Sequence, residues 1–308
     1  MPSHPAPTSL VRPPAPDRFW ADAEVVLEPE DPRPGSWAGG PSVQLVDGTW
    51  WLAARLRRPV GAGRGFANVV SRSDDGVRFT PVVAVGKDRF GAESLERPAL
   101  VHTAGGRWRL YVSCATPGTK HWRVDLLEAD DVEGLATAEP RTVLPGSDRS
   151  AVKDPVIRHD GRQWHLWASV HPLDDPDATD RMTTEHAISP DGVDWTWQGT
   201  ALAGTPGSWD ARGVRFATVV LDGDRTWALY DGRATAGENW EERTGLAEVG
   251  RDGRFTAAAG GPLLESPHPP HGLRYADVVP LPGGGARWFY EATRADGAHE
   301  LRTVLLDG

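Results

Sequence analysis

The sequence predicts an all-β protein, and two observations lead to that prediction. First, glycine and proline supply 62 of the 308 residues (35 plus 27) and are spread along the chain. That composition suits short strands and turns and leaves little room for long helices. No segment keeps the 3.6-residue period of an amphipathic helix, and only ADDVEGLATA, residues 129–138, fits one short helix. The second observation is a repeated pair of strands.

The repeated unit is an apolar strand, a glycine-containing turn, a tryptophan and a second, alternating strand. Its five copies cover residues 39–56, 96–113, 150–170, 215–232 and 274–292. The tryptophans are Trp50, Trp108, Trp164, Trp227 and Trp288, and by subtraction their separations are 58, 56, 63 and 61 residues. Such constant spacing indicates five structurally equivalent units.

Each unit has room for about four strands. The segments SDDGVRF, SPDGVDW and GRDGRF place an Asp-Gly turn between two further strand-like runs. Four antiparallel strands in about 60 residues is the size of a propeller blade. The fifth copy ends with three strands, and AEVVLEP, residues 23–29, can supply the fourth. The sequence therefore predicts a five-bladed β-propeller whose last blade is closed by an N-terminal strand, so that no sheet edge stays exposed.

Domain organisation and partners follow from the bulk properties. We expect a disordered, proline-rich tail over residues 1–18 and a single propeller domain over 19–308. A net charge of −10 argues against a nucleic-acid partner, and no apolar stretch is long enough for a membrane span. The single cysteine, Cys114, fits a reducing compartment, so we expect a cytoplasmic protein. The expected partner is a small molecule, with no cofactor and no metal; the oligomeric state stays open.

One stretch carries a family resemblance. KDPVIRHDGRQWHLWAS, residues 153–169, begins with a lysine and an aspartate before a proline and continues into an aromatic-rich second strand. It resembles the five-bladed propeller glycosidases of glycoside hydrolase families 43, 32, 68 and 130. The resemblance implies hydrolysis or transfer of glycosyl groups in a pocket on the propeller axis. It also implies that the first strand of each blade begins at the mouth of that pocket, where Lys153 and Asp154 would lie.

The resemblance assigns roles to three carboxyl groups. These are a catalytic base in blade one, an orienting aspartate in blade three, and a glutamate in blade four that acts as the catalytic acid. Asp154 matches the blade-three aspartate. Blade one instead holds Gly39, Gly40 and Pro41, and blade four holds arginines. Hydrolysis of a glycoside commonly needs two carboxyl groups, so others would have to act. The candidate catalytic residues are Asp154, Asp210, Glu96 and Glu241, with Glu238 as an alternative to Glu241 and Asp277 as a further substitute base.

Many further charged and aromatic residues occur at the first-strand entrances and in the loops after the second strands. The candidate substrate-binding residues are Arg97, Lys153, Trp209, Arg212, Arg215, Asp231, Arg233, Trp240, His271, Arg274 and Asp277. Arginine pairs bidentately with carboxylate or phosphate groups. Two interpretations stay open: the arginines bind an anionic or heavily hydroxylated ligand, or each pairs with a neighbouring carboxylate in a structural network.

The sequence thus favours a glycoside hydrolase-like enzyme that acts on a small carbohydrate-like substrate, neutral or anionic, in the axial pocket. Two alternatives follow from the mismatched catalytic positions. One is a divergent enzyme with a non-hydrolytic reaction, such as cyclisation, elimination or isomerisation of a small metabolite. The other is a propeller that binds its ligand without turnover. Because fold does not fix chemistry, the site must decide among them.

Overall fold

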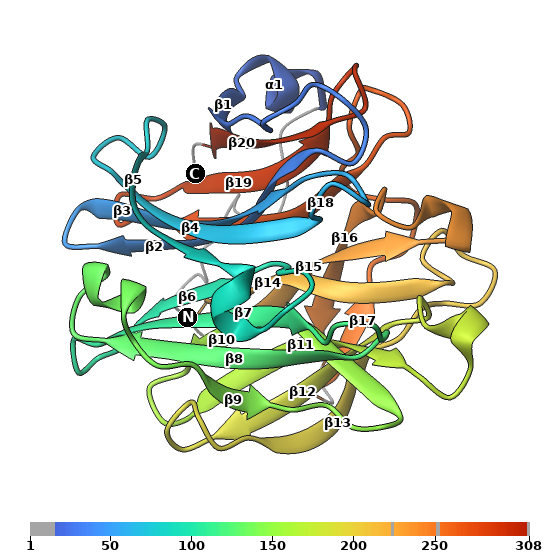
Figure 1. Ribbon diagram of the computed structural model, residues 1–308. Coiled ribbons are helices and arrows are strands. Elements are labelled where there is room, and N and C mark those ends of the chain that lie inside the picture. The colour runs from blue at the N-terminus through green and yellow to red at the C-terminus, as the bar shows by residue number, and fades with distance from the viewer. Residues whose placement is uncertain (1–15, 223–224, 251–252, 307–308) are drawn as a thin grey trace, which may run out of the picture.

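Strands dominate the computed structural model, which describes residues 16–222, 225–250 and 253–306 (Figure 1). They form one eight-stranded and three four-stranded sheets, which confirms the predicted all-β class. The helical segments are α1 (Pro16–Ala21) and the 3₁₀ turns η2 (Lys87–Phe90), η3 (Glu133–Ala136), η4 (Pro176–Ala178) and η5 (Ala236–Glu238). The short helix predicted within residues 129–138 is η3. None of the described helices has the length and apolar character needed to cross a membrane.

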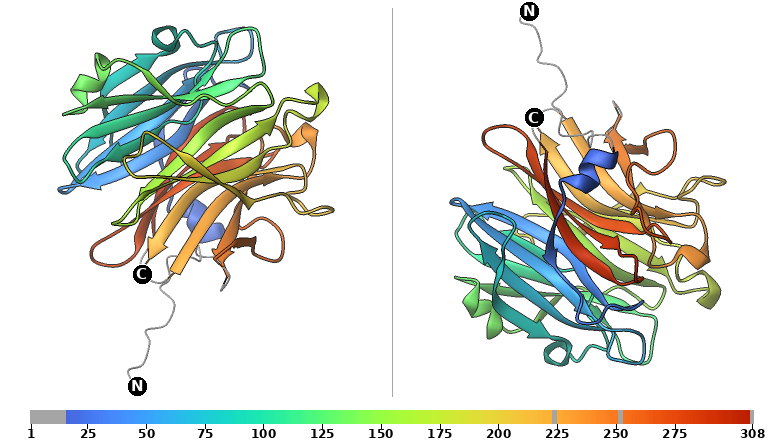
Figure 2. Two further views of the ribbon diagram at one scale, coloured as in Figure 1. Left: turned by 90° about the horizontal axis from the view of Figure 1, so that it is seen from below. Right: turned by 90° about the horizontal axis from the view of Figure 1, so that it is seen from above.

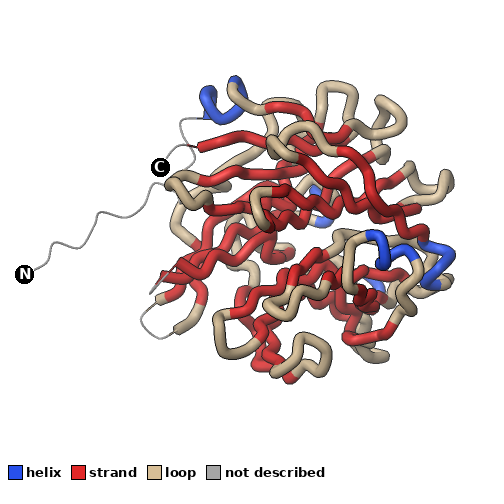
Figure 3. Tube along the Cα trace, turned by 90° about the vertical axis from the view of Figure 1, so that its left-hand side faces the viewer, coloured by secondary structure: helices blue, strands red, loops and turns tan. Residues whose placement is uncertain are grey.

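Each four-stranded sheet is one consecutive stretch of chain whose neighbouring strands are antiparallel. The first contains β6 (Ala99–His102), β7 (Trp108–Ala115), β8 (Trp122–Ala129) and β9 (Arg141–Leu144). The second contains β10 (Ser150–His159), β11 (Trp164–Pro172), β12 (Thr183–Ser189) and β13 (Thr196–Leu202). The third contains β14 (Gly213–Asp222), β15 (Arg225–Arg233), β16 (Arg243–Val249) and β17 (Phe255–Ala257). Figure 3 shows that strands make up much of the chain and that α1 lies at the edge of the molecule.

The eight-stranded sheet joins the two ends of the chain. One half contains β2 (Trp37–Val46), β3 (Thr49–Arg57), β4 (Gly65–Ser73) and β5 (Thr80–Gly86); the other contains β18 (Leu273–Pro280), β19 (Ala286–Thr293), β20 (His299–Leu306) and β1 (Glu24–Leu27). A single parallel pair, Trp37 with His299, connects the halves. Strand β1 pairs antiparallel with β20 (Figure 1). The predicted pairing of the N-terminal strand with the last strand is therefore confirmed.

The repeated strand pairs are β2–β3, β6–β7, β10–β11, β14–β15 and β18–β19. All five repeat tryptophans are at most 8% exposed and lie near the start of the second strand. Two of the Asp-Gly turns pack against them. A Cβ atom on Gly76 would lie 3.0 Å from the Trp50 ring, and one on Gly192 would lie 3.2 Å from the Trp164 ring. Both glycines also have positive φ angles, so turn and tryptophan specify each other within a unit.

The first strand of a repeat bulges near its beginning. The register shifts between Gly39 and Ser42, between Lys153 and Val156, between Phe216 and Thr218, and between Arg274 and Asp277. Gly40, Asp154 and Tyr275 have left-handed φ angles of 60°, 53° and 56° at these bulges. Bulges redirect side chains and often occur beside functional sites. Here they occur at the same end of each repeat and turn charged side chains toward one another.

Helix α1 packs over the last strands of the chain (Figure 2). Phe19 is fully buried, with its ring 5.0 Å from Tyr290 and 6.0 Å from Trp288. Of the expected tail over residues 1–18, residues 1–15 lie outside the described part of the chain, and α1 begins at Pro16. The stable body of the protein thus includes α1 as well as β1.

We expect deletion of residues 1–30 to destabilise the protein severely, because it removes both α1 and the strand that pairs with β20. Phe19→Ala should lower the free energy of unfolding by about 3–5 kcal/mol, as is common for a buried phenylalanine. Urea unfolding measures both effects. Val25→Ala, at a side chain of β1 that is 42% exposed, is the control and should change stability little. Equal unfolding of the intact and shortened chains would show that this pairing is dispensable.

Candidate functional site

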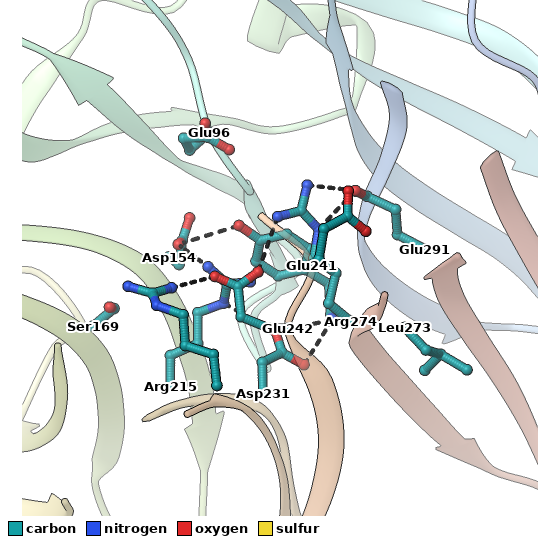
Figure 4. A network of polar contacts seen from close by, with 12 residues as sticks. Glu96, Asp154, Ser169, Arg215, Asp231, Glu241, Glu242, Leu273, Arg274 and Glu291 are labelled. Atoms are coloured by element: carbon teal, nitrogen blue, oxygen red, sulfur yellow. Dashed lines mark hydrogen bonds and ion pairs between the residues drawn. The ribbon is translucent and has the colours of Figure 1, made fainter. Parts of the chain in front are cut away.

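Residues at one end of the strand pairs meet in the middle of the molecule. Cross-strand partners at this end are Gly39 with Arg55, Lys153 with Ser169, Arg215 with Asp231, and Arg274 with Glu291. We call the following residues the charged network: Arg55, Glu96, Lys153, Asp154, Arg215, Asp231, Arg233, Glu242, Arg274 and Glu291. All but Lys153 are at most 5% exposed. Much of this network is visible in Figure 4.

Glu242 binds more arginines than any other carboxylate of the charged network. Its Oε2 atom lies 3.3 Å from Arg215 Nη2 and 3.1 Å from Arg274 Nη1. Its Oε1 atom accepts a hydrogen bond from Arg233. One carboxylate therefore links three guanidinium groups that come from β14, β15 and β18. Removing it would leave these buried cations without their common partner, which is very costly.

Glu291 explains why blade one has a glycine where a carboxylate was expected. Its Oε2 atom accepts a hydrogen bond of 2.6 Å from Arg55, and its Oε1 atom accepts one of 2.9 Å from Arg274. A Cβ atom on Gly39 would lie 2.2 Å from Glu291 Oε2. Any side chain at Gly39 would thus displace Glu291. Arg55 also pairs with Glu96, so β3 is tied to two other repeats.

The ring of Tyr275 fills the space between the arginines. It lies 3.9 Å from the guanidinium carbon of Arg215, 5.2 Å from that of Arg274, 5.5 Å from that of Arg55 and 5.8 Å from that of Arg97. Burial raises the pKa of its hydroxyl, so the ring stays neutral. Its electron-rich faces attract the surrounding cations. The left-handed backbone of Tyr275 at the β18 bulge makes this position possible.

Lys153 and Asp154 both lie in the charged network. The ammonium group of Lys153 is 3.2 Å from Asp154 Oδ2. The same oxygen lies 3.6 Å from Arg215 Nη1 and accepts a hydrogen bond of 3.4 Å from the Tyr275 hydroxyl. Asp154 Oδ1 is buried and has no hydrogen-bond partner among the described residues. Lys153 extends outward over the Trp122 ring, at 5.1 Å from its centroid.

The charges of the network are set by mutual pairing. Burial alone would raise the pKa of Glu242, but Arg215, Arg233 and Arg274 outweigh it and hold the pKa well below its usual value. Burial is likewise outweighed at Glu291 and at Glu96, where arginines lower the pKa. Asp231 behaves differently.

Asp231 is the one carboxyl of the charged network whose pKa rises. Burial and the nearby Glu242 raise it to about 6, although Arg215 opposes this shift. Its Oδ2 atom accepts a hydrogen bond of 2.9 Å from Arg215. Both of its oxygens lie 3.0 Å from the backbone nitrogen of Tyr275. Asp231 is fully buried, so it links β15 to β18 and does not face solvent.

A more open group of residues lies beside the network. We call Trp122, Lys153, Trp240 and Glu241 the mouth. The Lys153 side chain is 13% exposed, that of Glu241 is 20% exposed, and Trp240 is 42% exposed. Trp122 is half-buried. Trp122 starts β8, and Trp240 and Glu241 lie in the loop between β15 and β16. Aromatic faces next to a cation and a carboxylate suit a ligand with hydroxyl groups.

Four predicted site residues lie outside this region. Asp210 is buried, where it accepts hydrogen bonds from the Tyr230 hydroxyl at 3.0 Å and the Thr205 backbone N–H at 3.3 Å. Trp209 stacks on the same Tyr230 ring, at 5.6 Å. These two residues therefore hold the segment before β14 against β15.

The other two are Arg212 and His271. Arg212 forms an ion pair with Asp180, with Nε 2.8 Å from Oδ2. His271 is exposed, and its Nδ1 atom lies 2.8 Å from the carbonyl oxygen of Ser266. Each therefore has a local structural partner away from the charged network. The charged network therefore contains fewer of the predicted site residues than the sequence suggested.

Asp277 and Arg97 are buried beside the charged network and bind the backbone. Asp277 accepts hydrogen bonds of 2.8 Å from the backbone N–H of Val43 and from the Thr218 hydroxyl, and it pairs with Arg158 at 3.1 Å. Arg97 donates two hydrogen bonds, of 3.0 and 3.1 Å, to the carbonyl oxygen of Pro41. Both residues join neighbouring repeats.

Sequence analysis missed Arg55, Arg57 and Glu242. Arg55 and Arg57 end β3, where the second strand returns to the same end as the first-strand entrances. The second strands β15 and β19 supply Asp231, Arg233 and Glu291 at the same end of their repeats. The repeat pattern could therefore have predicted Arg55 and Arg57. Glu242 gave no such signal, because it follows an irregular loop. Its neighbour Glu241 was chosen instead.

The charged network is tightly filled. The three cavities found in the described residues, of about 1510, 500 and 440 Å³, are lined by none of its members. The largest lies between the outer strands of the repeats that contain β13 and β17. None of the four mouth residues lines these three cavities either.

The lowered pKa values predict strong acid sensitivity. Glu96, Glu242 and Glu291 contribute stability that is present above about pH 4.5 and is lost as the pH falls, because only the unfolded chain takes up protons there. Each group adds a slope of about 1.4 kcal/mol per pH unit. Asp231 has the opposite sign: its contribution is full at low pH and is lost as the pH rises through about 6.

Urea unfolding between pH 3 and 7 measures this slope. Below pH 4.5 we expect a steep fall in the free energy of unfolding, to which three groups contribute. Glu248→Gln, at an exposed glutamate of β16, should leave the slope unchanged and serves as the control. A free energy of unfolding that stays level from pH 5 to 3 would contradict the assigned ion pairing.

Comparison with known proteins gives structural likeness only. No family model matches the chain, and no curated protein sequence matches it. Among solved structures, the β-1,2-mannobiose phosphorylase from Listeria innocua, in complex with β-1,2-mannobiose, has a TM-score of 0.68 at 14% identity. The match covers 92% of this chain and 94% of that one.

Two further solved structures point the same way. The α-L-arabinofuranosidase from Lactobacillus brevis has a TM-score of 0.66 at 15% identity, covering 87% of this chain and 90% of that one. A thermostable family-43 glycoside hydrolase has a TM-score of 0.64 at 13% identity, covering 87% and 88%. At such low identity these likenesses establish the fold and leave the activity open. The chain shares the fold of these glycosidase and phosphorylase structures, in agreement with the resemblance to propeller glycosidases.

Proposed function

We propose that this protein is a glycosidase-like enzyme that binds a small carbohydrate-like molecule at the mouth. The observation that carries the proposal is that two partly exposed charged groups each have a tryptophan next to them: Lys153 lies 5.1 Å from the Trp122 ring, and Glu241 follows Trp240 in the chain. Tryptophan rings provide flat apolar faces for sugar rings, and the two charged groups can bind hydroxyls. The glycosidase-like fold supports this choice of ligand class. Both the phosphorylase and the arabinofuranosidase named above are enzymes named for carbohydrates.

The architecture under this proposal is a five-bladed propeller in one domain over residues 19–308. The three four-stranded sheets are three blades. The eight-stranded sheet is two more, because only the pair of Trp37 and His299 connects its halves. Each blade then contributes at least one residue to the charged network, from its first strand, its second strand or a segment beside them. The expected cytoplasmic location and the expected tail stay predictions from the sequence.

Asp154 acts in this proposal through Lys153. Its carboxylate is buried and lies 3.2 Å from the Lys153 ammonium group. The ammonium group in turn reaches over Trp122. Asp154 therefore positions the cation that touches the ligand, whereas the sequence had suggested that it acts on the substrate directly.

Lys153 is the cation of the charged network that a negatively charged group on the ligand could reach. Its side chain is 13% exposed, whereas the arginines of the network are at most 2% exposed. The predicted carboxylate- or phosphate-bearing sugar would therefore pair with Lys153.

A second candidate function, ligand binding without turnover, is favoured by the buried carboxylates. By the resemblance, Gly39, Gly40 and Pro41 stand at the position of the base, and the neighbourhood of Arg212 and Arg215 stands at the position of the acid. Glu242 and Glu291 are bound by arginines and are inaccessible. Two accessible carboxyl groups in the usual arrangement are therefore lacking at the described positions. A non-hydrolytic reaction stays an alternative for the same reason.

Isothermal titration calorimetry with β-1,2-mannobiose and α-1,5-arabinobiose, each with and without a carboxylate substituent, tests the proposal. We expect Trp122→Ala and Trp240→Ala each to weaken binding about tenfold, which corresponds to ~1.4 kcal/mol of lost stacking. Trp197→Ala is the matched control, since Trp197 is 44% exposed but lies on the outer strand β13. Binding that survives both mouth substitutions, or is lost with Trp197→Ala, would place the ligand elsewhere.

A further inference from the structure

Three side chains form a continuous line from the mouth into the charged network. Glu241 Oε1 lies 3.1 Å from His299 Nε2, and His299 Nδ1 lies 2.9 Å from Glu291 Oε1. The side-chain exposure falls along this line, from 20% at Glu241 to 1% at His299 and 0% at Glu291. A solvent-accessible carboxyl group is thus connected through a buried imidazole to a buried carboxylate.

The surroundings of Glu291 determine where the protons lie. Arg55 and Arg274 bind both of its oxygens, and they keep it ionised. An ionised carboxylate only accepts hydrogen bonds, so His299 must donate its Nδ1 proton to Glu291. The other ring nitrogen then faces Glu241, and one proton is shared between them. Either Glu241 is protonated and donates to Nε2, or the imidazolium donates to the Glu241 carboxylate.

His299 is held firmly enough to keep this geometry. Its ring stacks on Trp37, with centroids 4.9 Å apart and planes 17° apart. Its backbone N–H donates a hydrogen bond of 3.1 Å to the carbonyl oxygen of Ser36. Thr293 donates its hydroxyl to Glu241 Oε2 at 2.7 Å, which fixes the carboxyl plane. The Trp37 ring also lies 5.8 Å from Trp240, so the mouth and the line share a wall.

We propose that Glu241 is the general acid that cleaves a glycosidic bond at the mouth, with His299 and Glu291 as its positioning residues. This rests on the proposed carbohydrate site. The Glu241 proton passes to the departing glycosidic oxygen as the bond from the anomeric carbon to that oxygen breaks. A water molecule forms the new bond to the anomeric carbon and releases one proton to solvent. His299 and Glu241 regain a shared proton from solvent, so atoms and charge balance.

The other carboxyl groups nearby are less suited to donate a proton. Glu238 accepts hydrogen bonds from the backbone N–H groups of Ala234 and Thr235 and from Arg243, so it serves as a cap of η5. Glu96 is paired with Arg55 and Arg57. Glu241 has a histidine rather than an arginine as its charged partner. It can therefore carry the proton that a general acid must deliver.

The first test compares leaving groups on the full-length protein. The probes are the 2,4-dinitrophenyl and phenyl glycosides of α-L-arabinofuranose and β-D-mannose. Glu241→Gln should lower kcat on a phenyl glycoside about 10²- to 10⁴-fold, the usual contribution of general acid catalysis. It should change kcat on the dinitrophenyl glycoside little, because dinitrophenolate departs without a proton. Glu238→Gln, in the same loop, should leave both rates unchanged.

The second test reads the histidine directly. Nitrogen-15 NMR of the intact protein should show a proton on His299 Nδ1, and Glu241→Gln should change the signal of Nε2 and leave Nδ1 protonated. A merely structural Glu241 would leave the ratio of the two rates unchanged, although the Nε2 signal would still respond to the lost contact. An equal loss of kcat on both glycosides, or an Nδ1 atom without a proton, would overturn the assignment.

The outcomes separate this inference from the proposed function. Sugar binding that depends on Trp122 and Trp240, without cleavage of either glycoside, overturns the acid role and leaves the binding site intact. Absence of sugar binding overturns both. Cleavage of the phenyl glycoside that Glu241→Gln abolishes, while cleavage of the dinitrophenyl glycoside continues, supports the acid role together with the site.

Discussion

The contact of Glu242 with three arginines is the interaction on which the rest of the structure depends. A guanidinium group loses its hydration on burial and must be paired and hydrogen-bonded to be tolerated. Arg215, Arg233 and Arg274 are each at most 2% exposed, and Glu242 is their common anion. This requirement fixes the ends of β14, β15 and β18 relative to one another. The Tyr275 ring then has one place left to occupy.

The same pairing explains why the site departs from the pattern that the sequence resemblance implied. Glu291 occupies the space beside Gly39 and is bound by Arg55 and Arg274. Carboxylates are thus present close to the expected positions, but they stabilise the fold and are not free to act on a substrate. Chemistry, if the protein performs it, must use groups at the edge of the network. Glu241 is in that position because a histidine connects it to Glu291.

The repeat made much of this predictable. Lys153, Asp154, Arg215 and Arg274 were identified because strands of equal length begin at the same end of each unit, and the structure brings all four together. Arg55 lies at the equivalent end of a second strand, so the repeat could have predicted it as well. It was missed because it is one of several polar and apolar residues that alternate along β3. Loops carry no such period, so the pairing of Arg212 with Asp180 and the choice between Glu241 and Glu242 could not be derived from the sequence. Those contacts depend on how the loops between the strands pack against the sheets.

A crystal structure of the protein with a bound disaccharide tests the central claim most directly. The account predicts a sugar ring stacked between Trp122 and Trp240, within hydrogen-bonding distance of Lys153 and Glu241, while the contacts of Glu242 stay unchanged. A ligand that enters the charged network and displaces Glu242 from its arginines, or one that binds in the cavity between β13 and β17, would contradict it.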